Sequence, residues 1–211
     1  MHVVHYGRYS MIERWVEWPS GRDQWLAFCL LFSALAGCAS PSGSGARVEP
    51  LPNAACCTTF EEMKYSTLKP DAETSLDLRK GSPVYSFDEG RSYFASFDLP
   101  ASSGPRKLVF KTFMGGTILP FATVVRPYFL FLDEGHSPIG KVQDPPVFSG
   151  SDFFRGVFFK GEVEVPPEAK HVIIYTSDKP VTPWTVYSEN GIAWPAKPSM
   201  TGNLLIKVSN P

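Results

Sequence analysis

Short stretches in which apolar and polar side chains alternate dominate the chain after residue 55, as is typical of β-strands. Residues 92–99 alternate with Tyr93 and Phe97 among the inward positions, which predicts a strand with one buried face. Residues 107–113 alternate in the same way. Residues 128–132 are apolar throughout, which predicts a central strand covered on both faces. Further strands are expected at 153–165, 171–176 and 204–208, with Gly156 and Gly161 as candidate bulges.

Proline and glycine punctuate these strands at short intervals, which favours an all-β fold: an antiparallel two-sheet β-sandwich, jelly-roll-like, over residues 56–211. Helix is expected only at residues 60–68, where Thr58 or Thr59 precedes two glutamates as a capping residue. The stretch Thr182 to Pro198 is rich in proline and has no clear strand periodicity, so we interpret it as a connection.

A different pattern marks the beginning of the chain, where an apolar run from Trp25 to Ala36 ends in Leu35-Ala36-Gly37-Cys38. The run is shorter than the roughly 20 residues that span a bilayer, so residues 1–37 are predicted to be a signal peptide, with Met11 as an alternative start. The last four residues resemble the lipobox of bacterial lipoproteins. This resemblance implies acylation of Cys38, as by palmitate, and a membrane contact through that lipid anchor. The alternative is a secretory signal in which Cys38 is an ordinary small residue.

Residues 38–55 are expected to be the lipidated cysteine and a flexible tether, because they are rich in Ser, Gly, Ala and Pro. Ala39, directly after the cysteine, resembles the default that sends lipoproteins to the periplasmic face of the outer membrane. Two or more acyl chains on Cys38 would anchor the protein stably.

Cys56 and Cys57 are the only thiols that remain after signal removal and lipidation. Adjacent Cα atoms lie ~3.8 Å apart across a trans peptide, whereas ordinary disulfides span ~4.4 to 6.8 Å, so a bridge between them needs a distorted or cis linkage. A vicinal disulfide, two free thiols and an intermolecular bond all remain open, and a redox role is a further alternative.

Composition excludes several classes of function. The 211 residues carry 20 Lys and Arg against 21 Asp and Glu, and no basic patch is visible, so no nucleic acid partner is expected. No catalytic, phosphate-binding or metal-ligand motif is present, and we expect no cofactor, no metal and no enzymatic activity. His136 and His171 are interpreted as solvated or packing residues. The acids Asp133, Glu134 and Asp152, which a glycosidase would need as a pair, are expected to serve turns.

Several short motifs together resemble the maltose operon periplasmic protein (MalM) family. They are Cys56-Cys57 with Phe60, Leu68-Lys69-Pro70, Ser82-Pro83, Gly90-Arg91-Ser92-Tyr93-Phe94, Phe97-Asp98-Leu99-Pro100, Pro127-Tyr128-Phe129-Leu130-Phe131-Leu132-Asp133, Ser137-Pro138, Arg155-Gly156 and Tyr175-Thr176-Ser177. The resemblance covers most of residues 56–178. It implies an envelope protein of maltodextrin utilisation with no set of catalytic residues.

Two functions from different classes follow. The first is a glycan-binding accessory of maltodextrin uptake near the outer membrane, in which Trp184, Tyr187 and Trp194 stack on sugar rings. The competing interpretation of these three rings is that they pack their loop onto the sandwich. The second function is a structural or assembly lipoprotein that binds another envelope protein and has no sugar ligand.

Overall fold

The computed structural model describes residues 55–209 except 117, 178, 180–181 and 189, and all of these belong to one compact unit. The predicted signal peptide, Cys38 and nearly all of the tether lie outside the described residues. The elements are β1 (Tyr65–Thr67), β2 (Thr74–Leu78), β3 (Val84–Phe87), β4 (Gly90–Asp98), β5 (Arg106–Gly115), the 3₁₀ turn η1 (Leu119–Phe121), β6 (Thr123–Val125), β7 (Tyr128–Leu132), β8 (Pro138–Val142), β9 (Val147–Asp152), β10 (Gly156–Val165), β11 (His171–Tyr175), β12 (Trp184–Tyr187), β13 (Ala193–Ser199) and β14 (Gly202–Ser209).

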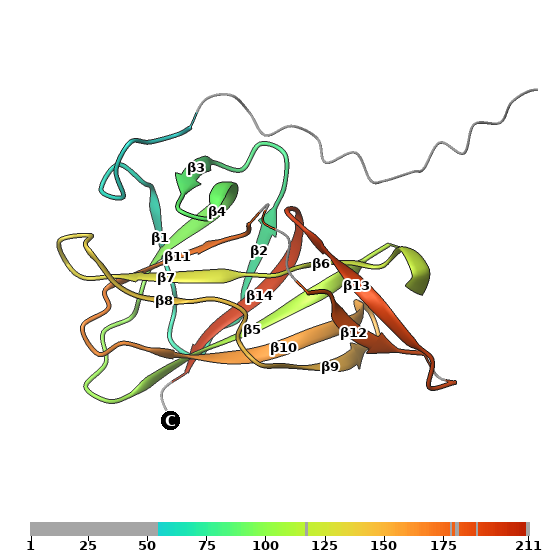
Figure 1. Ribbon diagram of the computed structural model, residues 1–211. Coiled ribbons are helices and arrows are strands. Elements are labelled where there is room, and N and C mark those ends of the chain that lie inside the picture. Colours follow the sequence, from blue (N-terminus) through green and yellow to red (C-terminus); the bar gives the residue numbers. More distant parts are fainter. Residues whose placement is uncertain (1–54, 117, 178, 180–181, 189, 210–211) are drawn as a thin grey trace, which may run out of the picture. The chain divides into compact units, whose positions relative to one another are not determined.

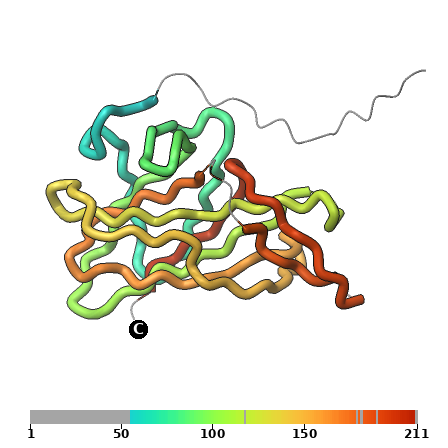
Figure 2. Tube along the Cα trace, in the orientation of Figure 1, coloured from blue at the N-terminus to red at the C-terminus, as the bar shows by residue number. Residues whose placement is uncertain are grey.

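The strands form two sheets that pack as a sandwich, which confirms the predicted all-β class (Figure 1). One sheet has the order β1-β4-β11-β7-β8, with β3 also paired to β4. The other has the order β12-β13-β6-β5-β10-β9, with β14 between β5 and β2. Pairing is antiparallel except for β1 with β4 and β13 with β6. The tube in Figure 2 shows β9 and β10 as neighbouring strands and the hairpin of β12 and β13 beside them.

The main core lies between the two sheets. Phe129 and Phe131 of β7 meet Leu108 and Phe110 of β5 there, and all four side chains are fully buried. The rings of Phe110 and Phe129 lie 5.2 Å apart between their centroids. The alternation predicted for residues 107–113 and the two-sided burial predicted for residues 128–132 are therefore confirmed. Burial of this apolar surface is the main driving force for the sandwich.

The expectation that residues 92–99 form a strand with one buried face is wrong. Phe94 and the small polar residues Ser92 and Ser96 point away from the main core, yet they are also buried. A second apolar cluster covers this outer face. It is built by Met63, Phe87, Phe94, Tyr128, Leu130, Leu132, Ile173 and Tyr175, with Cys57, Phe60, Tyr65 and Tyr85 packed against it.

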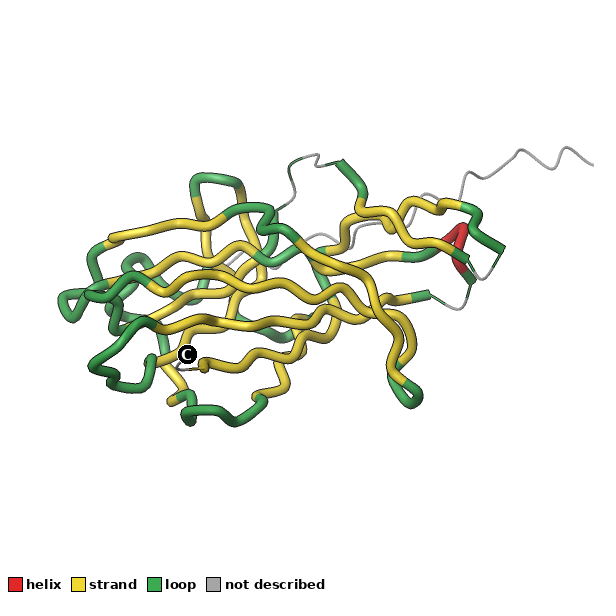
Figure 3. The backbone as a smooth tube through the Cα atoms, turned by 90° about the horizontal axis from the view of Figure 1, so that it is seen from below, coloured by secondary structure: helices red, strands yellow, loops and turns green. Residues whose placement is uncertain are grey.

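Two predictions of secondary structure are corrected. Residues 60–68 form turns and the short strand β1 instead of a helix, although Thr58 still donates from its backbone N–H to the Glu62 carboxylate at 2.6 Å. The stretch Thr182 to Pro198, expected to be a connection, contains β12 and β13. Within the described residues the one helical element is η1 (Figure 3). None of these residues forms a helix that is long and apolar enough to cross a membrane.

Gly161 is not a bulge, because it pairs in regular register with Phe110 on one side and Val147 on the other. A Cβ at this position would lie 2.6 Å from the Phe110 ring and 2.8 Å from the Pro146 carbonyl oxygen. Glycine is therefore needed for close packing. Gly156 is not a bulge either, because it begins β10 directly after the turn and pairs with Asp152. Its φ of 77° explains why the position holds glycine.

Arg106 of β5 links two loops at one end of the sandwich through hydrogen bonds. Its buried guanidinium donates four hydrogen bonds of 2.7 to 3.4 Å to backbone carbonyls. The acceptors are Pro100, Pro166, Pro167 and Ala169. Burial lowers the pKa of Arg106, and the carbonyls supply the partners that its charge needs away from water.

Candidate functional site

A groove of about 610 Å³ lies on the outer face of the six-stranded sheet, over the second apolar cluster. This volume is within the range typical of small-ligand sites. β3, β8 and β11 and the turn between β3 and β4 supply most of its lining. The lining residues are Phe60, Tyr85, Ser86, Phe87, Asp88, Glu89, Leu130, Pro138, Ile139, Gly140, Lys141 and Tyr175.

Aromatic rings form one wall of the groove. Phe87 stacks face to face on Tyr175 at 3.8 Å between ring centroids, and Tyr85 meets Phe87 edge-on at 4.9 Å. Phe60 continues the series with its ring 5.2 Å from Tyr85. Phe60 and Tyr85 are half-buried, whereas Phe87 and Tyr175 are buried. Phe60 and Tyr85 therefore offer ring surface that a ligand can reach.

Glu89 places a carboxylate at the floor of the groove. Its Oε1 accepts hydrogen bonds from Lys141 Nζ and, at 2.8 Å, from Gln143 Nε2, and its Oε2 accepts one of 2.7 Å from the Tyr175 hydroxyl. The Glu89 side chain is 8% exposed, while the neighbouring Asp88 side chain is 95% exposed and lies 3.7 Å from Lys141 Nζ. The groove thus combines aromatic surface with two carboxylates and one ammonium group.

The ionisation of this network is set by competing causes. Burial favours the neutral form of Glu89, but the hydrogen bonds from Lys141 and Tyr175 outweigh it and lower the pKa of that carboxyl. The hydrogen bond to Glu89 raises the pKa of Lys141. Burial raises the pKa of Tyr175, and its bond to Glu89 adds to the effect. Glu89 and Lys141 are consequently an ion pair at neutral pH, and the Tyr175 hydroxyl keeps its proton.

The local chain explains why these groups converge. β3 and β4 pair from Val84 with Tyr93 to Phe87 with Gly90, so Asp88 and Glu89 form a two-residue hairpin turn. Gly90 has a φ of 120°, which only glycine adopts readily. Lys141 of β8 lies opposite Leu130 of β7 on the same outer face and reaches Glu89 from the β8 edge of the sheet.

The predicted cysteine pair lies beside this wall. Cys56 and Cys57 form a vicinal disulfide with Cα atoms 3.8 Å apart, and the described residues contain no cis peptide bond. The Cys56 N–H donates to the Val84 carbonyl at 2.8 Å, and the Tyr85 hydroxyl donates to the Thr58 carbonyl at 3.3 Å. These bonds hold the segment that carries Phe60 against β3.

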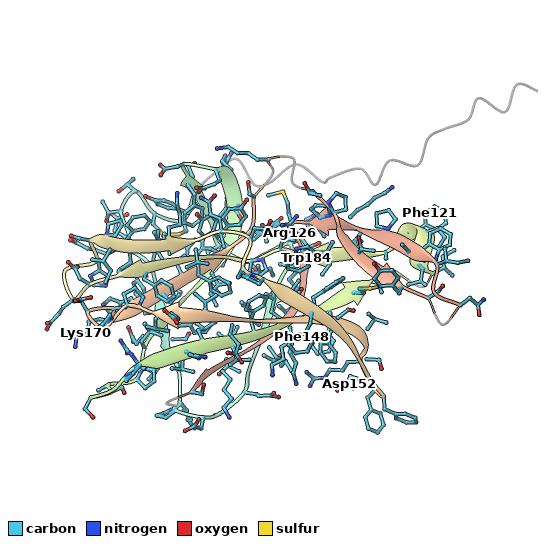
Figure 4. All side chains as sticks on the ribbon, turned by 60° about the horizontal axis from the view of Figure 1, so that its bottom comes forward. Phe121, Arg126, Phe148, Asp152, Lys170 and Trp184 are labelled. Atoms are coloured by element: carbon cyan, nitrogen blue, oxygen red, sulfur yellow. A yellow bond between two sulfur atoms is a disulfide. The ribbon has the colours of Figure 1, made fainter. Side chains whose placement is uncertain are left out.

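The three rings predicted to contact glycan do not share one face. Trp184 and Trp194 are half-buried and pack on a third apolar cluster formed by Val124, Phe159, Val186 and Ala196. Tyr187 alternates to the opposite face of β12 and is 64% exposed. Trp184 also lies under Arg126, whose guanidinium carbon is 4.9 Å from the ring centroid, and donates to Asp144 at 3.2 Å (Figure 4).

The other candidates from the sequence occupy structural positions. The Oδ1 atoms of Asp133 and Asp152 each accept backbone N–H bonds of 2.8 to 3.0 Å within their own turns. His136 and His171 stack at 4.3 Å, and His171 Nδ1 lies 2.9 Å from Asp98 Oδ1, a pairing that their sequence spacing does not reveal. Over residues 55–209, leaving out the gaps, no group of three or more His, Cys, Asp or Glu side chains is arranged to hold a metal.

The residues of the groove were missed in the sequence because each has an ordinary local role. Asp88-Glu89-Gly90 resembles any polar hairpin turn, and Lys141 resembles any lysine of an edge strand. The only available signal was the run of aromatic residues at 85, 87 and 94 beside this turn. Comparisons of the chain with protein-family models, with curated proteins and with solved structures find no match.

Proposed function

We propose that this chain is a non-catalytic, glycan-binding lipoprotein of the cell envelope that serves as an accessory in maltodextrin uptake. The resemblance to the MalM family and the lipobox-like Leu35-Ala36-Gly37-Cys38 support the envelope and maltodextrin parts of the proposal. The glycan site we assign is the groove over β3, β8 and β11 rather than the hairpin of β12 and β13.

One observation carries the assignment of the site: reachable ring surface and charged acceptors lie side by side in one groove. Sugar rings present apolar C–H faces, which stack on aromatic side chains such as Tyr85 and Phe60. Sugar hydroxyls are hydrogen-bond donors, and the exposed carboxylate of Asp88 accepts such bonds at the rim. At Glu89 the existing bonds hold the carboxylate in place, so its geometry is fixed before a ligand enters.

Calorimetric titration of the chain with maltodextrins tests this function. Tyr85→Ala removes reachable ring surface, so we expect its affinity to fall about tenfold. The matched control is Tyr187→Ala, which removes the same ring from an exposed position on the other sheet and is expected to leave the affinity unchanged. The heat of binding is a better readout than tryptophan fluorescence, because Trp184 and Trp194 pack in the cluster beside β6 and β10, away from the lining of the groove.

Two outcomes would contradict the proposal. Weaker binding in Tyr187→Ala, with Tyr85→Ala unaffected, moves the glycan to the β12–β13 hairpin. No heat with any maltodextrin removes the glycan function and favours the alternative, a structural lipoprotein that binds another envelope protein.

A further inference from the structure

The hairpin of β9 and β10 ends in two adjacent, fully projecting phenylalanines. Phe153 and Phe154 are 94% and 91% exposed, and their rings meet edge-on, 5.1 Å apart between centroids. Asp152 fixes the turn, since its Oδ1 accepts the N–H groups of Phe154 at 2.9 Å and Arg155 at 3.0 Å. Figure 4 labels Phe148 and Asp152 along this hairpin, with Asp152 at its outer end. The tip is therefore an ordered turn that exposes apolar surface.

Cations lie directly behind the tip on the outer face of the eight-stranded sheet. The Arg155 guanidinium carbon is 5.4 Å from the Phe113 ring centroid, and Lys111 and Lys160, which face each other across β5 and β10, lie over neighbouring phenylalanine rings at 5.6 Å. Glu73 lies 3.5 Å from Lys111, and Asp152 is the acid of the turn. Arg155, Lys111 and Lys160 are thus three positive side chains near the hairpin, while Glu73 pairs with Lys111 and the carboxylate of Asp152 is held by backbone N–H groups.

Arg155 also borders a hollow of about 360 Å³ behind the tip. Ser75 and Asn203 line this hollow together with Phe113 and Met114. A guanidinium group beside a hydroxyl and an amide matches the oxygen-rich headgroup of a phospholipid, because all three donate hydrogen bonds to phosphate oxygens. Apolar side chains therefore lie at the outer end of the hairpin, and the groups that can donate to phosphate lie behind them.

We infer that the β9–β10 tip inserts Phe153 and Phe154 into the surface of an anionic lipid bilayer, with Arg155, Lys111 and Lys160 facing the headgroups. The size of the tip favours lipid over protein, because the turn comprises only residues 153–155, whereas a specific protein interface engages about 20 to 30 residues on each side. Hydrocarbon accepts apolar side chains without a complementary shape, and basic residues near an anionic surface add attraction. This inference goes beyond glycan binding and holds with or without the predicted anchor on Cys38.

Co-sedimentation of the full chain with lipid vesicles tests the inference. Vesicles of phosphatidylcholine alone are compared with vesicles that also contain phosphatidylglycerol. The double variant Phe153→Ser with Phe154→Ser is expected to bind the mixed vesicles at least about tenfold more weakly, because two apolar side chains no longer enter the bilayer. The matched control is Phe121→Ser, which removes a ring that is 64% exposed in η1. Because all variants share the N-terminal segment, its own affinity for lipid cancels from the comparison.

Two further measurements separate insertion from other occupants of the tip. Arg155→Gln is expected to weaken binding to the mixed vesicles and to leave binding to phosphatidylcholine unchanged. Mixed vesicles are expected to slow amide hydrogen exchange at residues 152–156 in the wild-type chain. Equal binding by the double serine variant and the wild type overturns the inference. So does a concentration-dependent dimer, without vesicles, that the double variant abolishes, since a second copy of the chain then covers the tip.

Discussion

Neutralising Glu89 by the substitution Glu89→Gln tests whether the ion pair at the floor of the groove stabilises the fold. The wild-type carboxylate accepts three side-chain hydrogen bonds, from Lys141, Gln143 and Tyr175. Glutamine has nearly the same shape, and its amide oxygen and NH₂ group retain partners among these three residues. The substitution therefore removes the charge while it leaves the packing in place.

The expected loss follows from the difference between charged and neutral hydrogen bonds. A bond to a charged group contributes about 1.5 to 3 kcal/mol and a neutral one about 0.5 to 1.5 kcal/mol, so each bond weakens by about 1 kcal/mol. For three bonds, the free energy of unfolding therefore falls by at most about 3 kcal/mol in Glu89→Gln. The Lys141 side chain is 31% exposed and regains water, which reduces the loss to about 2 kcal/mol.

The pH dependence gives the sharper test. The folded-state pKa of Glu89 is lowered from its ordinary value of 4.5, so the carboxylate stabilises the fold above that value, and this contribution is lost as the pH falls through the folded pKa. Urea unfolding at pH 7 is expected to show the full difference between wild type and Glu89→Gln. The difference should shrink progressively below pH 4.5.

Equal stability of the two proteins at pH 7 would refute the reasoning, and so would a loss that stays constant well below pH 4.5. The first result would mean that desolvation of Glu89 cancels its bonds. The second would mean that the glutamine disturbs packing and that the charge is irrelevant. Lys141→Met serves as the partner variant, because the double variant should lose less than the sum of the two single losses.

Two other substitutions have clear expectations. Gly161→Ala is expected to lower the free energy of unfolding by about 1 to 3 kcal/mol, since its Cβ would meet the Phe110 ring and the Pro146 carbonyl; Gly104→Ala, with no atom within 4 Å of the new Cβ, is the neutral control in the same urea titration. Arg106→Met is expected to lower the free energy of unfolding by on the order of 3 kcal/mol, because four carbonyls lose their hydrogen-bond donor. A melting temperature equal to that of the wild type would contradict this expectation.

Local pattern was sufficient where the burial of a strand follows from its own residues. All five side chains of β7 are buried, because Phe129 and Phe131 face the main core and the other three belong to the second apolar cluster on the outer face. The same pattern did not reveal β13, because Pro195 and Pro198 interrupt its alternation and remove two donors. β13 forms nevertheless, in register with β12 over residues 193–196 and with β6 over residues 197–199.

β4 shows where a local pattern is insufficient. Ser92 and Ser96 alternate with large apolar residues and therefore predict a solvent-facing side. In the fold, the Ser92 hydroxyl shares a 2.7 Å hydrogen bond with the Thr176 hydroxyl, and Ser96 donates to the Lys64 carbonyl at 2.8 Å. These partners allow the serines to be buried without an unsatisfied hydroxyl. No pattern within residues 90–98 indicates that such partners exist.

The sequence by itself determined the all-β class and the inward faces of β5 and β7, because each depends on neighbours along the chain. Only the tertiary structure decided which surfaces become a groove, an apolar tip or a covered face. Glu89 meets Lys141, Gln143 and Tyr175 across separations of 52, 54 and 86 residues. The period of two in a strand is a local property of the backbone, whereas the burial of a polar side chain depends on which distant segment packs against it.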